Sequence, residues 1–195
     1  GIPLLVDEAH GTHFYFNGRL PPGAITSGAD ACAQSIHKTG GALTQSSLLH
    51  VKSRLIDLDR LDNALRMTMS TSPSYVLMAS IETARAQLEQ NGEALLDYAL
   101  ELADEIREQI NLIPGLSTPD LSSAVHDPLR VIVNCRKLGV SGYDVKRELY
   151  EYWRIDSEMG GLNELLFIVN WGNTKEEGRL LVSALKELAD KYAGT

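Results

Sequence analysis

The stretch that decides the fold is Ala33-Gln34-Ser35-Ile36-His37-Lys38-Thr39-Gly40-Gly41-Ala42-Leu43-Thr44-Gln45-Ser46-Ser47. It holds one lysine, next to a histidine, in a run that is otherwise uncharged. A lysine that condenses with an aldehyde must lose its proton near neutral pH, which desolvation and a neighbouring cation promote. Ser35 and His37 can hydrogen-bond a phosphate, and the glycine pair lets backbone approach closely. The stretch indicates an amine-and-anion site, although an exposed lysine at a strand end would give the same pattern.

The residues around this stretch predict a small sheet with functional groups at one end. An apolar run over 4–6 indicates a buried strand, and the acidic pair Asp7-Glu8 follows it, where open α/β sheets place functional groups. Glycine and proline make 11–28 a loop. Residues 29–38 and 42–51 are then predicted as strands joined by a glycine turn, with Lys38 at that turn.

Helical spacing follows the predicted sheet. Leu58, Leu61 and Leu65 predict a short amphipathic helix. Ser72-Pro73 supplies an N-cap and a proline at the first helical position, which predicts a helix to about residue 90. After Gly92 an apolar stripe predicts a second long helix that ends at Pro114-Gly115.

The last third of the chain predicts a unit of its own. A strand is predicted over 131–133 and another over 165–169. Each precedes a capping-box pattern, which begins at Ser141 for one helix and at Thr174 for the other. The order strand, helix, strand, helix predicts a small α/β domain over 114–195.

Composition narrows the class of partner. The 26 acidic residues outnumber the 18 basic ones and give a formal net charge of -8, which argues against a basic surface for nucleic acid or an anionic membrane. Apolar stretches such as 165–169 are far shorter than the roughly 20 residues of a membrane span. A small molecule is the favoured partner.

Terminal and cysteine features give two further expectations. Cys32 and Cys135 have no paired spacing, so we expect two free thiols and a reducing, cytoplasmic setting. Residues 1–6 run directly into an apolar strand without a lead-in. The hypothesis is that the natural polypeptide extends upstream of Gly1.

Four segments resemble one family in the same order along the chain. The run from Ser35 to Ser47 resembles the pyridoxal-phosphate attachment signature of the ornithine/lysine/arginine decarboxylases. The other three are Val6-Asp7-Glu8-Ala9-His10-Gly11 with His13-Phe14, Gly28-Ala29-Asp30, and Ser70-Thr71-Ser72-Pro73-Ser74-Tyr75 followed by Leu77-Met78-Ala79-Ser80. The resemblance is strong over 3–86 and weaker from 158 to the end.

The resemblance implies a fold-type I, aspartate-aminotransferase-like enzyme of the α/β class. Residues 1–113 would be the second half of the large cofactor-binding domain, including long connecting helices, and 114–195 the small α/β domain. The upstream half of the large domain would supply the main phosphate-binding loop. We therefore expect this chain alone to be a poor catalyst.

The resemblance also assigns roles at the site. Catalytic roles fall to Lys38 as the Schiff-base lysine, to Asp7 as the partner of the pyridine nitrogen, and to His10, which faces cofactor or substrate. The cofactor-binding residues implied are Lys38, Asp7, Ala9, His10, Ser35, His37, Thr71 and Ser72. Ser35 and His37 would touch the phosphate. The Thr71-Ser72 turn would reach the phosphate in a neighbouring subunit, which implies a homodimer or a higher homo-oligomer.

The implied reaction is pyridoxal-phosphate-dependent decarboxylation of arginine, lysine or ornithine to an amine and carbon dioxide, with arginine favoured by resemblance. Lys38 would then be a candidate proton shuttle. Glu158 is one residue that could read the distal cation of the substrate.

Other interpretations remain open at this stage. The chain could be a catalytically silent module of the same fold, or run another reaction such as transamination. Asp7-Glu8-Ala9-His10 also spells a helicase acidic box, although no G-x-x-x-x-G-K-[ST] loop occurs in these residues. Asp7, His10 and His13 could bind a metal, but no fourth ligand is evident and we expect no metal.

Overall fold

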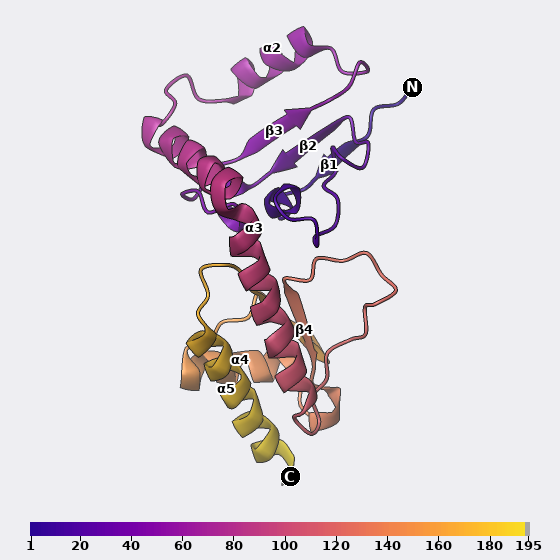
Figure 1. The fold of residues 1–195 in the computed structure, drawn as a ribbon, viewed down its shortest axis with the longest axis vertical. Coiled ribbons are helices and arrows are strands. Elements are labelled where there is room, and N and C mark those ends of the chain that lie inside the picture. The colour runs from indigo at the N-terminus through magenta and orange to yellow at the C-terminus, as the bar shows by residue number, and fades with distance from the viewer. Residues whose placement is uncertain (194–195) are drawn as a thin grey trace. The chain divides into compact units, whose positions relative to one another are not determined.

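The computed structural model describes residues 1–193, which form two compact units, one over Gly1–Ala94 and one that begins at Leu95. Each unit is built around its own three-stranded sheet (Figure 1). The division between the units falls inside a continuous helix. The domain boundary expected between 113 and 114 concerns the fold of the longer protein and stays a prediction.

The first sheet contains β1 (Leu5–Asp7), β2 (Ala31–Gln34) and β3 (Leu48–Val51), in the order β1-β2-β3. β1 and β2 are parallel, with Asp7 opposite Ala33, and β3 is antiparallel to β2. Because parallel strands end at the same edge, the segments that follow Asp7 and Gln34 emerge side by side. This edge brings together residues that lie about 30 positions apart in sequence.

The attachment stretch differs locally from its prediction. Lys38 lies in a one-turn helix, α1 (Ile36–Thr39), and not in a turn between two strands. The Lys38 N–H donates to the Ser35 carbonyl at 2.9 Å, and the Gly40 N–H donates to the Ile36 carbonyl. β3 is also shorter than the strand predicted over 42–51, because Gln45 has φ 72° and sits in a turn.

Three helical elements complete the first unit. They are the 3-10 turn η1 (Thr12–Tyr15), α2 (Leu58–Thr68) and the start of α3 (Tyr75–Asn111). The Asp57 carboxylate caps α2 by accepting from two backbone N–H groups. At the start of α3, the Ser74 hydroxyl accepts from the Leu77 N–H at 3.3 Å. Ser74, and not the predicted Ser72, therefore occupies the capping position.

The prediction of two long helices around Gly92 was wrong, because α3 runs unbroken for 37 residues. A glycine inside a helix costs only about 1 kcal/mol relative to alanine, which packing can offset. A Cβ at Gly92 would lie 3.0 Å from the Cβ of Phe16, so the absent side chain leaves room for that ring. Gly92 is a packing position rather than a helix end.

The second unit contains β4 (Arg130–Asn134), β5 (Met159–Gly160) and β6 (Glu164–Ile168), antiparallel in the order β4-β6-β5. Its helices are η2 (Arg136–Leu138), α4 (Gly142–Trp153) and α5 (Lys175–Ala193). Both predicted capping boxes are confirmed, since Ser141 accepts from the Asp144 N–H and Thr174 exchanges bonds with Glu177. The two-residue strand β5 was not predicted.

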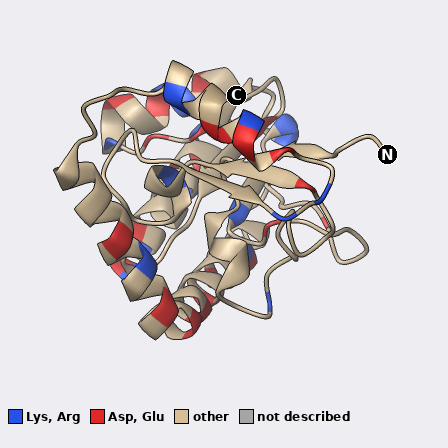
Figure 2. Cartoon of the chain, turned by 90° about the horizontal axis from the view of Figure 1, so that it is seen from above, with Lys and Arg blue, Asp and Glu red and all other residues tan. Residues whose placement is uncertain are grey.

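Both cysteines are buried and unpaired, as expected. Acidic and basic residues lie on the same helices (Figure 2). On α3, for example, Arg85 forms ion pairs with Glu82 and Glu89. Within residues 1–193, no helix is both long and apolar enough to cross a membrane.

Candidate active site

The carboxylate at the end of β1 is held in place by the turn that follows it. The Ala9 N–H donates to Asp7 Oδ1 at 3.0 Å, and the Ser35 N–H donates to the Ala9 carbonyl at 3.2 Å. These bonds join the β1 end to the start of α1. Asp7 Oδ2 makes no hydrogen bond to any other group in residues 1–193 and can accept one from a bound molecule.

Lys38 and His10 meet at the same edge. Lys38 Nζ lies 3.3 Å from His10 Nε2, although the two residues are 28 positions apart. Lys38 is exposed and His10 is half-buried. At this distance one of the two nitrogens can donate a hydrogen bond to the other, and the imidazole tautomer decides which one donates. The pair can therefore hold a proton and pass it between Nζ and Nε2.

Two further groups flank Lys38 on α1. His37 Nδ1 lies 2.7 Å from the backbone carbonyl of Ser46. Ser35 begins α1, but its hydroxyl makes no capping bond and has no other partner within the described chain. The buried hydroxyls of Thr39 and Ser46 also lack a partner among residues 1–193. Polar groups with unused bonding capacity therefore surround Lys38, as expected where a polar molecule binds.

Glu8 forms a buried hub beneath this edge. Glu8 is 9% exposed, and its carboxylate accepts from Tyr15 Oη at 3.0 Å and from Gln34 Nε2 at 2.7 Å. The Ala24 N–H also donates to it at 2.6 Å, and Cys32 Sγ lies 3.5 Å away. Burial, with Glu8 adding to it, raises the pKa of both the Tyr15 hydroxyl and the Cys32 thiol.

Sequence reasoning missed the structural role of Glu8, although one signal was present. Glu8 follows Asp7 directly, so the strand's alternation sends the two carboxylates in opposite directions. A Cβ at Gly11 would collide with the Glu8 side chain, which explains a glycine in that turn. The helicase interpretation needs this carboxylate to reach water and magnesium, and the buried hub does not allow that.

Replacing Glu8 with glutamine is expected to destabilise the complete protein by about 2 to 4 kcal/mol, since an amide nitrogen would face buried donors. Urea unfolding followed by circular dichroism measures the change. The matched control is Glu176→Gln, at an exposed position near the start of α5. Equal stability of the two variants would show that the Glu8 hub is not structural.

The structure does not bring every predicted residue to this edge. Thr71 and Ser72 are exposed in the link between α2 and α3, where the Ser72 N–H donates to the Ser70 hydroxyl. No hydrogen bond within residues 1–193 connects them to Lys38 or Asp7. Across the same residues, His, Cys, Asp and Glu side chains form no group of three that could hold a metal.

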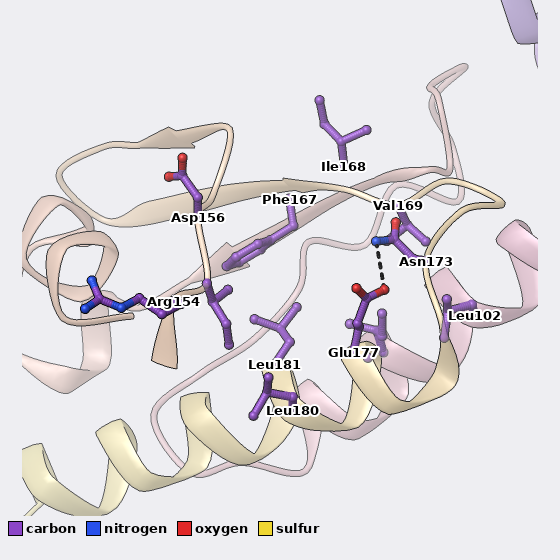
Figure 3. Close-up of a pocket in the computed structure, with 13 residues that line it drawn as sticks. Leu102, Arg154, Asp156, Phe167, Ile168, Val169, Asn173, Glu177, Leu180 and Leu181 are labelled. Carbon is purple, nitrogen blue, oxygen red and sulfur yellow. Dashed lines mark hydrogen bonds between the residues drawn. The ribbon is translucent and has the colours of Figure 1, made fainter. Parts of the chain in front are cut away.

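A separate hollow of about 290 Å³ lies in the second unit (Figure 3). Phe167 and Leu181 contribute apolar walls, and its acidic groups are Glu177 and Asp156, of which Asp156 pairs with Lys146 at 3.2 Å. Glu177 is already occupied, because it accepts from Asn173 Nδ2 at 3.4 Å and from the Thr174 N–H at 2.8 Å. The β1–β2 edge, which carries an amine, an imidazole and a carboxylate, is the stronger candidate for chemistry.

Residues 1–121 match the family described as Orn/Lys/Arg decarboxylase, major domain, so the chain belongs to that family. It is 43% identical to an arginine decarboxylase of Halalkalibacterium halodurans, over 98% of this chain and 40% of the relative. The chain thus spans about two fifths of that relative's length. Family membership also removes the helicase interpretation.

Solved structures confirm the expected fold. Lysine decarboxylase A from Pseudomonas aeruginosa superposes with a TM-score of 0.82 at 22% identity, covering 98% of this chain and 33% of that one. An alanine–glyoxylate aminotransferase from Nostoc sp. superposes with a TM-score of 0.73 at 20% identity, covering 96% and 54%. At these identities the likeness shows the fold alone, which is the aspartate-aminotransferase-like α/β fold.

Proposed function

We propose that the complete protein is a pyridoxal-phosphate-dependent decarboxylase of a basic amino acid, with arginine as the first candidate and with Lys38 as the attachment lysine. The observation that carries the proposal is the convergence of Asp7, His10 and Lys38 on one sheet edge. The 43% identical arginine decarboxylase supports arginine as the first substrate to test.

The residues present fit the cofactor's three functional parts. An aldehyde needs a primary amine, which Lys38 offers at the exposed face of α1. A protonated ring nitrogen needs an acceptor, which Asp7 Oδ2 supplies. A phosphate needs donors, and Ser35 and His37 lie within three residues of Lys38. When bound, pyridoxal phosphate supplies an electron sink for the pair left behind as carbon dioxide departs.

The negative charge of Asp7 would strengthen the cofactor's capacity to accept electrons. Asp7 Oδ1 accepts a hydrogen bond from the Ala9 N–H at 3.0 Å, which restrains the carboxylate and leaves Oδ2 available to a bound molecule. A carboxylate held against a ring nitrogen favours the protonated, cationic ring. Ala9, which contributes that N–H and no long side chain, leaves space for a flat ring above the turn.

Lys38 and His10 would handle the protons. Before attachment, His10 Nε2 can accept the proton that the Lys38 amine must lose. With cofactor and substrate bound, the Lys38 Nζ would be placed to carry a proton to the substrate carbon that loses its carboxylate. The 3.3 Å separation keeps both groups within reach of the same proton.

The exposed Thr71-Ser72 segment would contribute to the active site of a second copy of the chain. Because it is exposed and has no hydrogen bond to its own Lys38 within residues 1–193, it is available to reach the cofactor phosphate of a second copy. We therefore propose a homodimer or a higher oligomer as the active form.

The buried, unpaired thiols fit a reducing compartment, and we place the protein in the cytoplasm.

Product analysis tests the reaction class. Full-length protein given pyridoxal phosphate and arginine is expected to release carbon dioxide and the corresponding amine in equal amounts, with lysine and ornithine turned over more slowly. Gas trapping and chromatography of the amine measure this. A keto acid without carbon dioxide would indicate transamination instead, and cofactor binding without any product would indicate a silent module.

A further inference from the structure

We infer that Asp30 is a positioning residue, which holds the start of β1 in register and so places the Asp7 carboxylate at the edge that carries Lys38. The inference rests on the proposed function and adds a residue on which the same site depends. Asp30 directly precedes β2 and lies at the opposite end of that strand from Lys38. It would therefore act through Asp7 and not by contact with the reacting atoms.

Asp30 bonds Leu4, the residue before β1, through both its side chain and its backbone. The Leu4 N–H donates to Asp30 Oδ2 at 2.7 Å, and the Asp30 N–H donates to the Leu4 carbonyl at 2.9 Å. The Ala31 N–H adds a longer bond to the same carbonyl, at 3.3 Å. These bonds join one residue of each strand in both directions, so they define which residues of β1 and β2 pair.

Asp30 is itself held by the chain that follows β3. Its carbonyl accepts from the Lys52 N–H at 3.0 Å. Hydrogen bonds from the Ser53 hydroxyl and the Leu4 N–H lower the pKa of the Asp30 carboxyl. An ionised acceptor forms a stronger hydrogen bond to a backbone N–H than a neutral one does. Asp30 thus ties the start of β1 to the other two strands.

Burial of its own side chains does little to fix the register of β1. The strand has three residues, of which Leu5 is 67% exposed and Val6 is half-buried. Register is weakly specified where neither face of a strand is buried, and a slip by one residue turns every side chain to the opposite face. Such a slip would carry Asp7 away from its present side of the sheet.

Residue-specific bonds at the two ends of β1 oppose this slip. Backbone pairing repeats along a strand, whereas a side-chain bond forms in one register only. The buried Glu8 hub holds the end of the strand. Asp30 holds the start, at Leu4, which is three residues or about 10 Å from Asp7. Without Asp30, β1 would be anchored by side chains at one end.

Asp30→Ala in full-length protein removes the anchor, and Asp57→Ala is its matched control. Asp57 also accepts from backbone N–H groups in the first unit, but those groups belong to α2. Hydrogen exchange is measured by mass spectrometry on protein without cofactor. Exchange over residues 4–8 is expected to be about ten-fold faster in Asp30→Ala and unchanged in Asp57→Ala.

A double-mutant cycle with Asp7→Asn separates positioning from a general structural effect. Alone, Asp30→Ala should lower kcat by about ten- to hundred-fold, because a small displacement of a distant catalytic group has effects of that size. In the Asp7→Asn background the same change should lower kcat by less than about two-fold, since the charge that Asp30 positions is already absent. Asp30→Asn keeps an oxygen that can accept from the Leu4 N–H and should stay within about three-fold of the unmodified kcat.

An equal loss of kcat in both backgrounds, or unchanged hydrogen exchange over residues 4–8 in Asp30→Ala, overturns the inference. If Asp30→Ala does not fold, Leu4→Pro removes the donor instead, since a strand can begin with proline, and it should show the same coupling to Asp7. Borohydride labelling of Lys38 tests the proposed function separately. Without that label the proposed function fails, while hydrogen exchange still decides whether Asp30 anchors β1.

Discussion

Full-length protein carrying Lys38→Ala is expected to lose at least about 10³-fold in kcat. The side chain removed is the exposed amine that lies 3.3 Å from His10 and would both attach the cofactor and return a proton. No other lysine lies in the stretch from Ala33 to Ser47. Steady-state carbon dioxide release measures kcat, and gel filtration shows whether the variant keeps its oligomeric state.

Two comparison variants make the Lys38 result specific. Lys38→Arg keeps a positive charge but lacks a primary amine, so it should be as inactive as the alanine variant. Lys137→Ala removes an exposed lysine in η2 and should leave kcat within about two-fold. Activity near the unmodified level in Lys38→Ala would refute the attachment role.

Replacing Asp7 with asparagine is expected to lower kcat by about 10²- to 10³-fold, since a preorganised charge is lost where charge develops. Asparagine is a close test because its Oδ1 can still accept from the Ala9 N–H, as Asp7 does at 3.0 Å. The turn should therefore persist while the negative charge disappears. Unchanged unfolding behaviour in urea would confirm that the loss is electrostatic.

A second substitution checks the position of that charge. Asp7→Glu keeps the carboxylate on a longer side chain and should recover part of the activity. If the Asp7→Asn variant and the unmodified protein turn over equally fast, Asp7 does not support the cofactor ring nitrogen, and the site must be reassigned.

Much of this site was predictable because its residues follow local rules. The apolar run before Asp7 predicts a strand by composition, and β1 is found there; its parallel pairing with β2 then brings Asp7 to the edge from which the lysine stretch continues. The helical turn at Lys38 was not predicted. The capping boxes at Ser141 and Thr174 are local hydrogen-bond patterns and were predicted correctly. Such features depend on neighbours within a few residues.

The remainder depends on contacts between distant residues. Gly92 looked like a helix end, but packing against Phe16 keeps α3 continuous. Glu8 became a buried hub only because Tyr15, Gln34 and the Ala24 N–H fold around it. His37 bonds to the backbone oxygen of Ser46, and the residue type does not reveal a backbone contact. This hydrogen bond therefore became visible only in the structure.

Borohydride reduction of full-length protein with pyridoxal phosphate, followed by peptide mapping, tests the central claim most directly. Reduction makes a cofactor–lysine bond permanent, and mass spectrometry then locates the modified residue. The account predicts one labelled lysine per chain, at Lys38, and no label when the protein carries Lys38→Ala. A folded protein that stays unlabelled, or is labelled at another lysine, would contradict it.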